Sequence, residues 1–230
     1  MKITDDIVMF IPACGLGTRM TLRGMKPFIH IHDSSETEEA MALDRVVSQA
    51  PNGMDIEIAL RKDMGCPKLR KEATVHFIDS SIGQANTIYK WLRRTRVRNY
   101  VLISNCDNRI DTTSIEQGIA MLSRSDGVRG IVYTFMPRIK EDDRWSYVDI
   151  DGNYRIKKIV EKKAISTHAV AGVYLLNMFA LRMALYPEDV YLSEALARMD
   201  GLYAKRAFHY EGWNDMDQLD ELERGWKQFC

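Results

Sequence analysis

The stretch IVMFIPACGLGTRMTLRGMKPFI, residues 7–29, decides the fold. It begins with an apolar run that predicts a buried strand, and the strand leads into a turn that contains Gly15 and Gly17. Glycine lets the main chain pass close to a ligand, so that successive N–H groups can converge on an anion. Arg19 and Lys26 add two cations within a few residues of this turn. The stretch therefore predicts a strand that ends in a phosphate-binding loop.

Other interpretations of the same loop compete with this one. A dinucleotide-binding G-x-G-x-x-G fingerprint needs a third glycine where Met20 stands. A P-loop needs a Lys-Ser or Lys-Thr pair, which does not follow here. A plain strand-to-helix turn without a ligand remains the alternative to a phosphate site.

The composition excludes several classes of protein. With 230 residues, of which 46% are hydrophobic, the chain can bury a core, and we expect a single domain over residues 1–230. Lys and Arg number 32, as do Asp and Glu, so the neutral chain gives no reason to expect binding to nucleic acid or to a membrane. The start MKITDD turns acidic where a signal peptide would be apolar, and no apolar run approaches a membrane span. We therefore expect a cytoplasmic protein.

The four cysteines, at positions 14, 66, 106 and 230, are scattered, with no C-x-x-C pair and no histidine cluster beside them. Neither a disulfide nor a zinc site is expected, which fits a reducing compartment. Cys14 and Cys106 adjoin candidate functional stretches, but neither has a base beside it in the sequence. Each is expected to be a small buried residue and not a nucleophile.

Strand and helix patterns alternate along the chain, which predicts an α/β domain with a largely parallel sheet. We expect helices that begin near residues 35, 80, 114, 178 and 193, and a last helix with Leu219 and Leu222. The expected strands cover 55–60, 74–78, 100–104, 130–135 and 207–210, and residues 168–176 are expected to form a small-residue turn that leads into a further strand. Two alternating runs about the Asp-Gly pair at 151–152 predict a hairpin, which leads to Glu161 and Lys162.

Polar side chains stand where three of these strands end. The amide of Gln84 offers donors and an acceptor, as reading the edge of a base requires, although polar residues there can simply cap a helix. Asp107 follows the strand at 100–104, at the edge where ligands bind in open α/β sheets, and is a candidate Mg²⁺ ligand. Its alternative role as a helix cap is less favoured, because Asp111 lies closer to that helix. Asp215 and Asp217 follow the last strand and would share a face if strand alternation continued; helix capping is their alternative.

Taken together, these pieces resemble the sugar-phosphate nucleotidyltransferase family, in a short, single-domain form like the nucleotide-sugar pyrophosphorylases. The resemblance rests on PACGLGTRM with Lys26-Pro27, GQA at 83–85, LISNCDN around Asp107, SYVDIDGNYRIKKIVEKK, AVAGVYLLN, and Trp213-x-Asp215. It implies a Rossmann-like, three-layer α/β/α sandwich with a mixed, mostly parallel sheet and a small β-lobe over the sugar.

The resemblance also implies a role for each candidate residue. Lys26 would contact the phosphates, and Gln84 would read the base. Glu161 would bind sugar hydroxyls, Lys162 the sugar phosphate, and Gly172 would line the sugar pocket. The metal ligands would be Asp107 with Asp215 or Asp217. The nucleotide and its triphosphate would be held by the loop residues Ala13, Gly15, Leu16, Gly17, Thr18 and Arg19.

The implied activity is the Mg²⁺-dependent joining of a nucleoside triphosphate (NTP) and a sugar 1-phosphate into a nucleotide sugar, with release of pyrophosphate. Two departures leave the substrate open. Lys26 follows Arg19 by seven residues, which is shorter than usual, and Asp217 replaces a common glycine, as in cytidylyltransferases of small phosphorylated alcohols. A CTP-dependent transferase of a phosphocholine-like or phosphonate substrate and a non-catalytic nucleotide-sugar-binding protein are the alternatives. Association into a homo-oligomer is left open.

Overall fold

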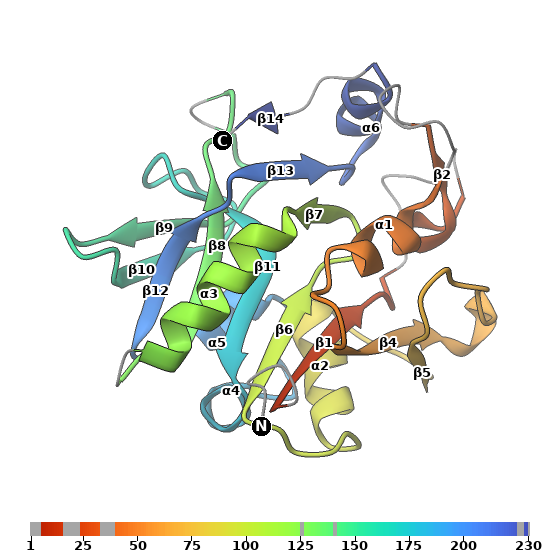
Figure 1. Cartoon of the computed structure of the whole chain (residues 1–230), viewed down its shortest axis with the longest axis horizontal. Coiled ribbons are helices and arrows are strands. Elements are labelled where there is room, and N and C mark those ends of the chain that lie inside the picture. Colours follow the sequence, from red (N-terminus) through yellow and green to blue (C-terminus); the bar gives the residue numbers. More distant parts are fainter. Residues whose placement is uncertain are drawn as a thin grey trace.

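The computed structural model describes residues 6–15, 24–32, 40–124, 127–139, 142–224 and 228–229, and a nine-stranded sheet forms its centre (Figure 1). The strands lie in the order β10 (Ile156–Val160), β9 (Tyr147–Ile150), β11 (Ala169–Asn177), β6 (Tyr100–Ser104), β1 (Ile7–Pro12), β4 (Asp55–Arg61) and β5 (Thr74–Ile78). Off this path, β8 (Gly130–Phe135) pairs with β11, and β12 (Leu202–Arg206) pairs with β8. Neighbours β6, β1, β4 and β5 are parallel, as are β8 and β12, whereas β11 is antiparallel to β6 and β8. The expected mixed, mostly parallel sheet is confirmed.

Strand β1 is buried along its whole length, between β4 and β6. Its side chains alternate between two hydrophobic cores: Ile7, Met9 and Ile11 belong to one, and Val8 and Phe10 to the other. A strand that is covered on both faces reads as a continuous apolar run. This is why residues 7–11 gave the first and correct indication of the fold.

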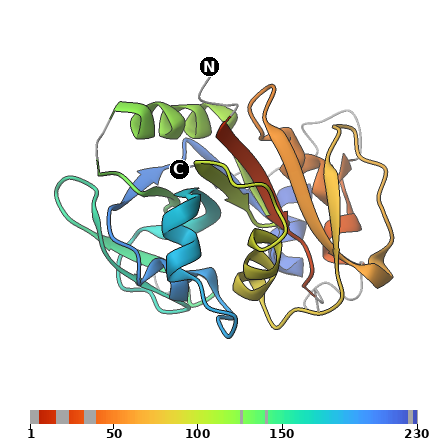
Figure 2. The ribbon, with the colours of Figure 1, turned by 90° about the horizontal axis from the view of Figure 1, so that it is seen from below.

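Helices cover both faces of the sheet (Figure 2). Helices α1 (Ala42–Ser48), α3 (Thr112–Arg124) and α6 (Met216–Glu223) pack in the core of Met9. Helices α2 (Gln84–Leu92), α4 (Met178–Ala184) and α5 (Leu192–Leu196) pack in the core of Phe10, whose ring stacks on Trp91 with the ring centres 3.9 Å apart. The expected three-layer α/β/α sandwich is therefore confirmed.

Two small sheets complete the described fold, and the sequence analysis did not predict them correctly. Strand β13 (His209–Gly212) pairs with β7 (Asn108–Ile110) and with β14 (Gln228–Phe229). The strand expected at 207–210 corresponds to β13, which begins two residues later, at His209. The preceding strand β12, which ends at Arg206 and belongs to a different sheet, was not predicted. Strand β2 (His30–Ile31) pairs with β3 (Ala40–Met41).

Three helix starts differ from expectation. Helix α1 begins at Ala42 and not near residue 35, because residues 40–41 pair as a strand and the Ala42 N–H donates to the Ile29 oxygen at 2.8 Å. Residue 35, near which this helix was expected to begin, lies outside the described residues. Helix α2 begins at Gln84, with Gly83 as its N-cap. Helix α3 begins at Thr112 and is capped by Asp111, whose carboxylate accepts the Ser114 N–H at 2.7 Å. Asp107 is therefore not the cap of that helix.

The hairpin of β9 and β10 is confirmed. The Asp151 carboxylate accepts the N–H groups of Asn153 and Arg155 at 2.8 and 3.0 Å, and Tyr154 has a φ of 63°. Such an Asx turn closes the loop locally, which is why the pattern was readable from sequence.

Among the described residues, no helix combines the length and the apolar character that crossing a bilayer requires.

Candidate active site

Two adjoining cavities lie beyond the carboxyl ends of β1 and β6. The larger one has a volume of about 770 Å³, and the smaller one about 390 Å³. The larger cavity extends past η4 (Lys62–Met64) and the segment between β5 and α2. The smaller one lies between the end of the hairpin and α5. The lining shared by both cavities consists of Pro12, Gly15, Lys26, Gly83, Gln84, Cys106 and Asp107.

Lys26 lies at the wall between the two cavities. It begins the short helix η3 (Lys26–Phe28), and Pro27 fixes the main chain just after it. The Lys26 ammonium is 2.8 Å from Asp107 Oδ2, and its side chain is only 11% exposed. It also donates to the main-chain oxygen and to Oδ1 of Asn214, at 2.9 and 3.0 Å. The predicted phosphate-binding lysine and the predicted metal-binding carboxylate are thus in direct contact.

The pairing of β7 with β13 brings Asp107 and Asn214 together. Asn108 is opposite Gly212 in this pair, and the Trp213 N–H donates to the Asp107 oxygen at 2.9 Å. Two segments that are far apart in the sequence are therefore joined by main-chain hydrogen bonds at the site. The Asp107 side chain is 15% exposed and faces both cavities.

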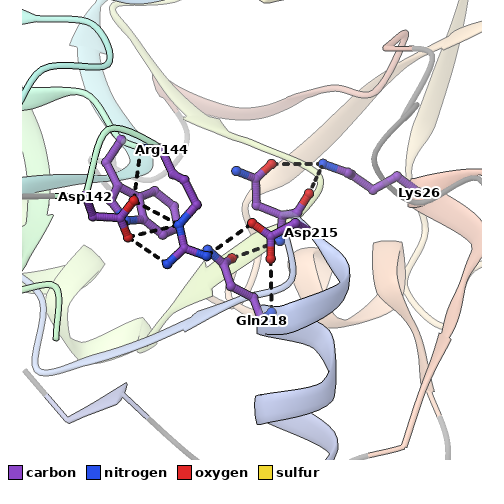
Figure 3. Close-up of polar contacts among 7 residues, drawn as sticks. Lys26, Asp142, Arg144, Asp215 and Gln218 are labelled. Atoms are coloured by element: carbon purple, nitrogen blue, oxygen red, sulfur yellow. Dashed lines mark hydrogen bonds and ion pairs between the residues drawn. The ribbon is translucent and has the colours of Figure 1, made fainter. Parts of the chain in front are cut away.

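Asp215 is the N-cap of α6, and its Oδ1 accepts the Gln218 N–H at 3.0 Å. Its other carboxylate oxygen lies 3.3 Å from the Arg144 guanidinium. Figure 3 shows Arg144 between Asp142 and Asp215, while Lys26 approaches from the opposite side. The expectation that Asp215 and Asp217 share a strand face is wrong, because a helix begins between them. Asp217 is exposed in the first turn of α6.

Arg144 is a site residue that the sequence analysis missed. It lines the smaller cavity and forms hydrogen bonds of 2.7–2.9 Å with the Asp142 carboxylate, which also accepts from the Trp145 indole. Burial opposes ionisation of Asp142, but the hydrogen bonds from Arg144 outweigh it and hold the pKa of Asp142 below its ordinary value. A fixed guanidinium therefore faces the smaller cavity. The only feature of the sequence that could have indicated Arg144 is its position shortly before the hairpin of β9 and β10.

The segment between β5 and α2 is packed too closely for a side chain at Gly83. A Cβ there would lie 2.4 Å from the Val190 oxygen, which accepts the Ala85 N–H at 3.1 Å. Gln84 follows, lines both cavities and donates from its amide nitrogen to Asn105 Oδ1. The predicted base reader is therefore in the site, held at the boundary of the two cavities.

The predicted sugar-phosphate residues line the smaller cavity together. Glu161 accepts hydrogen bonds from the hydroxyls of Ser146 and Ser193, the latter at 2.8 Å. The Lys162 ammonium donates a hydrogen bond to the Tyr191 hydroxyl at 2.9 Å, and it lies 4.8 Å from the centre of the Tyr191 ring. Lys162 has a φ of 51°, so the chain bends sharply where the hairpin ends.

Gly172 interrupts β11 with a φ of 67°. A Cβ at this position would lie 2.3 Å from Asn108 Nδ2 and 2.6 Å from Asn105 Nδ2. The Gly172 oxygen accepts the Asn105 N–H at 2.9 Å. The glycine thus permits close approach of β11 to the segment that carries Asp107. Tyr174, which the sequence analysis did not select, also lines this cavity, and burial, with the charges of Glu161 and Asp107, raises its pKa.

Part of the predicted nucleotide loop lies outside the described residues, namely Leu16, Gly17, Thr18 and Arg19. Gly15 lines both cavities. Ala13 is fully buried, and its N–H donates to the Ala59 oxygen at 2.9 Å. Burial raises the pKa of Cys14 to about 11, and burial together with the Asp107 charge raises that of Cys106 to about 12. Both thiols are therefore protonated and weakly nucleophilic at neutral pH.

The layers and the strand order are those of an α/β fold of the nucleotide-diphospho-sugar transferase type. No protein-family model matches the chain, and no curated protein matches it. Among solved structures, HddC from Yersinia pseudotuberculosis matches with a TM-score of 0.68 and 16% identity, over 95% of this chain and 99% of that one. HddC complexed with GMP-PN matches with a TM-score of 0.69 and 15% identity, over the same shares.

A third match is the nucleoside-diphosphate-sugar pyrophosphorylase from Vibrio cholerae RC9. Its TM-score is 0.65 at 14% identity, and the match covers 94% of this chain and 100% of that one. At these identities the matches concern the fold. They confirm the resemblance to the sugar-phosphate nucleotidyltransferases at that level.

Proposed function

We propose that this protein is a nucleotidyltransferase that joins a nucleoside triphosphate and a sugar 1-phosphate into a nucleotide sugar and releases pyrophosphate, with Mg²⁺ as cofactor. The observation that carries the proposal is the contact of Lys26 with Asp107 at the wall between two cavities. The larger cavity is of a size that suits a nucleotide, and the smaller one suits a phosphorylated sugar.

The chemistry needs charge and positioning more than a base. A phosphate monoester is mostly dianionic at pH 7, because its second pKa is about 6, so the acceptor needs no deprotonation. The obstacle is the approach of one anion to the phosphorus of another, which fixed cations and fixed geometry overcome. Lys26, which lines both cavities, is proposed to contact the triphosphate. Lys162 and Arg144, which line the smaller cavity, are proposed to bind the phosphate of the acceptor. Arg19 from the glycine loop is proposed to act with Lys26.

The residues at the junction suit Mg²⁺. This ion is usually held by one or two carboxylates, with water and substrate phosphates as its other ligands. Asp107 offers a carboxylate that faces both cavities, and Asn214 adds neutral oxygens beside it. Asp215 is the proposed second carboxylate, once it is free of Arg144. When bound, the ion would neutralise charge on the reacting phosphate.

Guanine nucleotides are the first donors to test. A neighbour with this fold was solved as a complex with GMP-PN. In this chain the larger cavity is lined by Asp63, Asp79 and Lys62, and the Lys62 ammonium lies 2.5 Å from Asp79 Oδ1. A carboxylate only accepts hydrogen bonds, which complements the two adjacent donors of guanine, N1–H and the N2 amino group. A lysine beside it complements the O6 acceptor.

The test is a matrix of the four NTPs and dTTP against a panel of sugar 1-phosphates and phosphocholine, read as released pyrophosphate. We expect release with one sugar 1-phosphate and one NTP, dependent on Mg²⁺. Release with CTP and phosphocholine alone would favour the cytidylyltransferase. Nucleotide-sugar binding without release anywhere in the matrix would favour a binding protein and contradict the proposal.

A further inference from the structure

Three oxygens enclose the Lys26 ammonium. They are Asp107 Oδ2 at 2.8 Å, the main-chain oxygen of Asn214 at 2.9 Å and Asn214 Oδ1 at 3.0 Å. An ammonium group has three donors and no acceptor, so these oxygens satisfy it fully. We call this set the oxygen cradle. Because the lysine is nearly buried, the cradle is a built cation site with an occupant supplied by the chain itself.

The chemistry of the cradle is that of a divalent cation site. A carboxylate, an amide side-chain oxygen and a main-chain carbonyl are the ligands that hard cations such as Mg²⁺ and Mn²⁺ take. The cradle carries one negative charge, from Asp107. One charge cannot offset both an ammonium and a divalent ion a few ångströms apart, since like charges repel strongly in a partly buried site.

While Arg144 holds Asp215, this second nearby carboxylate does not relieve the conflict. Asp215 Oδ1 is occupied by the Gln218 N–H, and its Oδ2 faces Arg144. Figure 3 shows these contacts on the far side of Asp215 from Lys26. Asn214, which carries no charge, is therefore the residue that completes the cradle beside Asp107.

We propose that Lys26 and a divalent cation are alternative occupants of the oxygen cradle formed by Asp107 and Asn214. The metal binds as the ammonium leaves, and the lysine then becomes available to the phosphate groups in the adjoining cavity. The inference rests on the proposed function only in taking Asp107 as a metal ligand. Such an exchange also explains how Lys26 can hold Asp107 and Asn214 together before the metal binds and contact phosphate groups afterwards.

The experiment is a titration of the nucleotide-free protein with Mn²⁺, in which free Mn²⁺ is measured by electron paramagnetic resonance. Lys26→Met removes the competing charge with little change in length, and we expect it to tighten Mn²⁺ binding about tenfold or more. Lys162→Met removes the same charge from the smaller cavity, outside the cradle, and should change the affinity little. Asp107→Asn and Asn214→Ala should each weaken Mn²⁺ binding.

Equal or weaker Mn²⁺ binding by a folded Lys26→Met variant would overturn the proposal, as would an absence of Mn²⁺ binding in every variant. Wild-type protein gives a second measurement that no folding defect can obscure. The ¹⁵N signal of the buried Lys26 ammonium, assigned by its loss in Lys26→Met, should lose its protection from exchange as Mg²⁺ is added. A signal that stays protected at saturating Mg²⁺ would contradict the proposal. No nucleotide is present, so failure of nucleotidyl transfer is a separate result.

Discussion

Lys162 is the residue whose role in substrate binding can be tested most cleanly. Its ammonium lies in the smaller cavity, and its neighbour Lys163 is exposed and not among the cavity residues. Lys162→Met should raise the KM for the sugar 1-phosphate by about tenfold to a hundredfold with a smaller effect on kcat, because a charge-assisted hydrogen bond is worth about 1.5–3 kcal/mol. Steady-state kinetics checks this. The matched variant Lys163→Met should have the wild-type KM. An equal rise in KM in both variants would contradict a role of Lys162 in binding the sugar 1-phosphate.

Lys26 should affect a different kinetic constant. If it stabilises charge that moves to the departing pyrophosphate, Lys26→Met lowers kcat by about a hundredfold or more, while the KM for the acceptor changes less. Rapid-quench measurement of the first turnover separates this effect from slow product release. An unchanged first-turnover rate would mean that Lys26 only binds substrate.

Some of these site residues could be predicted from the sequence and others could not, for a physical reason. Lys26, Asp107 and Lys162 sit in local patterns, a glycine loop, a strand exit and a hairpin exit, and each pattern was visible in the chain. Arg144 sits in a loop with no such pattern. Its position depends on Asp142 and Asp215, and the second of these lies far away in the sequence.

At the scale of elements, Gly172 lies where the pairing of β11 with β8 shifts register between Val170 and Tyr174. It controls how closely β11 approaches the segment that carries Asp107. Gly172→Ala should destabilise the fold for two reasons, the positive φ and the clash with Asn105 and Asn108. Gly53 also has a positive φ, of 80°, but open space around it, so Gly53→Ala isolates the first cost, about 1–2 kcal/mol. Urea unfolding of both variants checks this.

We expect Gly172→Ala to cost at least about 1 kcal/mol more than Gly53→Ala, since the amide groups in its way are held in a packed region. Equal losses in the free energy of unfolding of the two variants would mean that Asn105 and Asn108 move aside without cost. Pyrophosphate release should fall only in Gly172→Ala, because Asn105 also holds Gln84.

The elements that the sequence failed to predict are those made by distant pairing. Strands β7 and β13 are short, and neither is amphipathic over enough residues to be recognised alone. Residues 40–41 have a helical pattern with α1, yet their pairing with residues 30–31 delays the start of the helix. The hairpin and β1 were predicted correctly because a local turn or a continuous apolar run specifies them.

At the scale of the molecule, a buried ionic network joins three elements around the site. Glu211 on β13 is fully buried and lies 2.8 Å from Arg45 on α1 and 2.5 Å from Arg109 on β7. Burial alone would raise the pKa of Glu211, but hydrogen bonds from His209 and Arg109 and the charge of Arg109 outweigh it, so its pKa lies far below the ordinary value. The network therefore helps to hold β7 and β13 together next to Asp107.

Glu211→Gln should destabilise the protein by about 3–5 kcal/mol, because it leaves the Arg45 guanidinium buried without its carboxylate. The contribution of a carboxylate with a depressed pKa is present above its unfolded-state pKa, about 4.3, and is lost as the pH falls towards the folded-state value. The stability difference between wild type and variant should thus stay constant from pH 8 to 5 and narrow below about pH 4. Urea unfolding across this range checks it. A difference that narrows between pH 8 and 6 would contradict the assignment.

The central claim is that phosphate groups from two substrates meet at Asp107 and Lys26. Its most direct test is Mg²⁺-dependent pyrophosphate release by Asp107→Asn, with the exposed Asp149→Asn on β9 as the matched control, using the substrate pair that wild type accepts. We predict that Asp107→Asn stays folded and loses release by about a thousandfold or more, while Asp149→Asn keeps the wild-type rate. Release by Asp107→Asn at the wild-type rate would contradict the account.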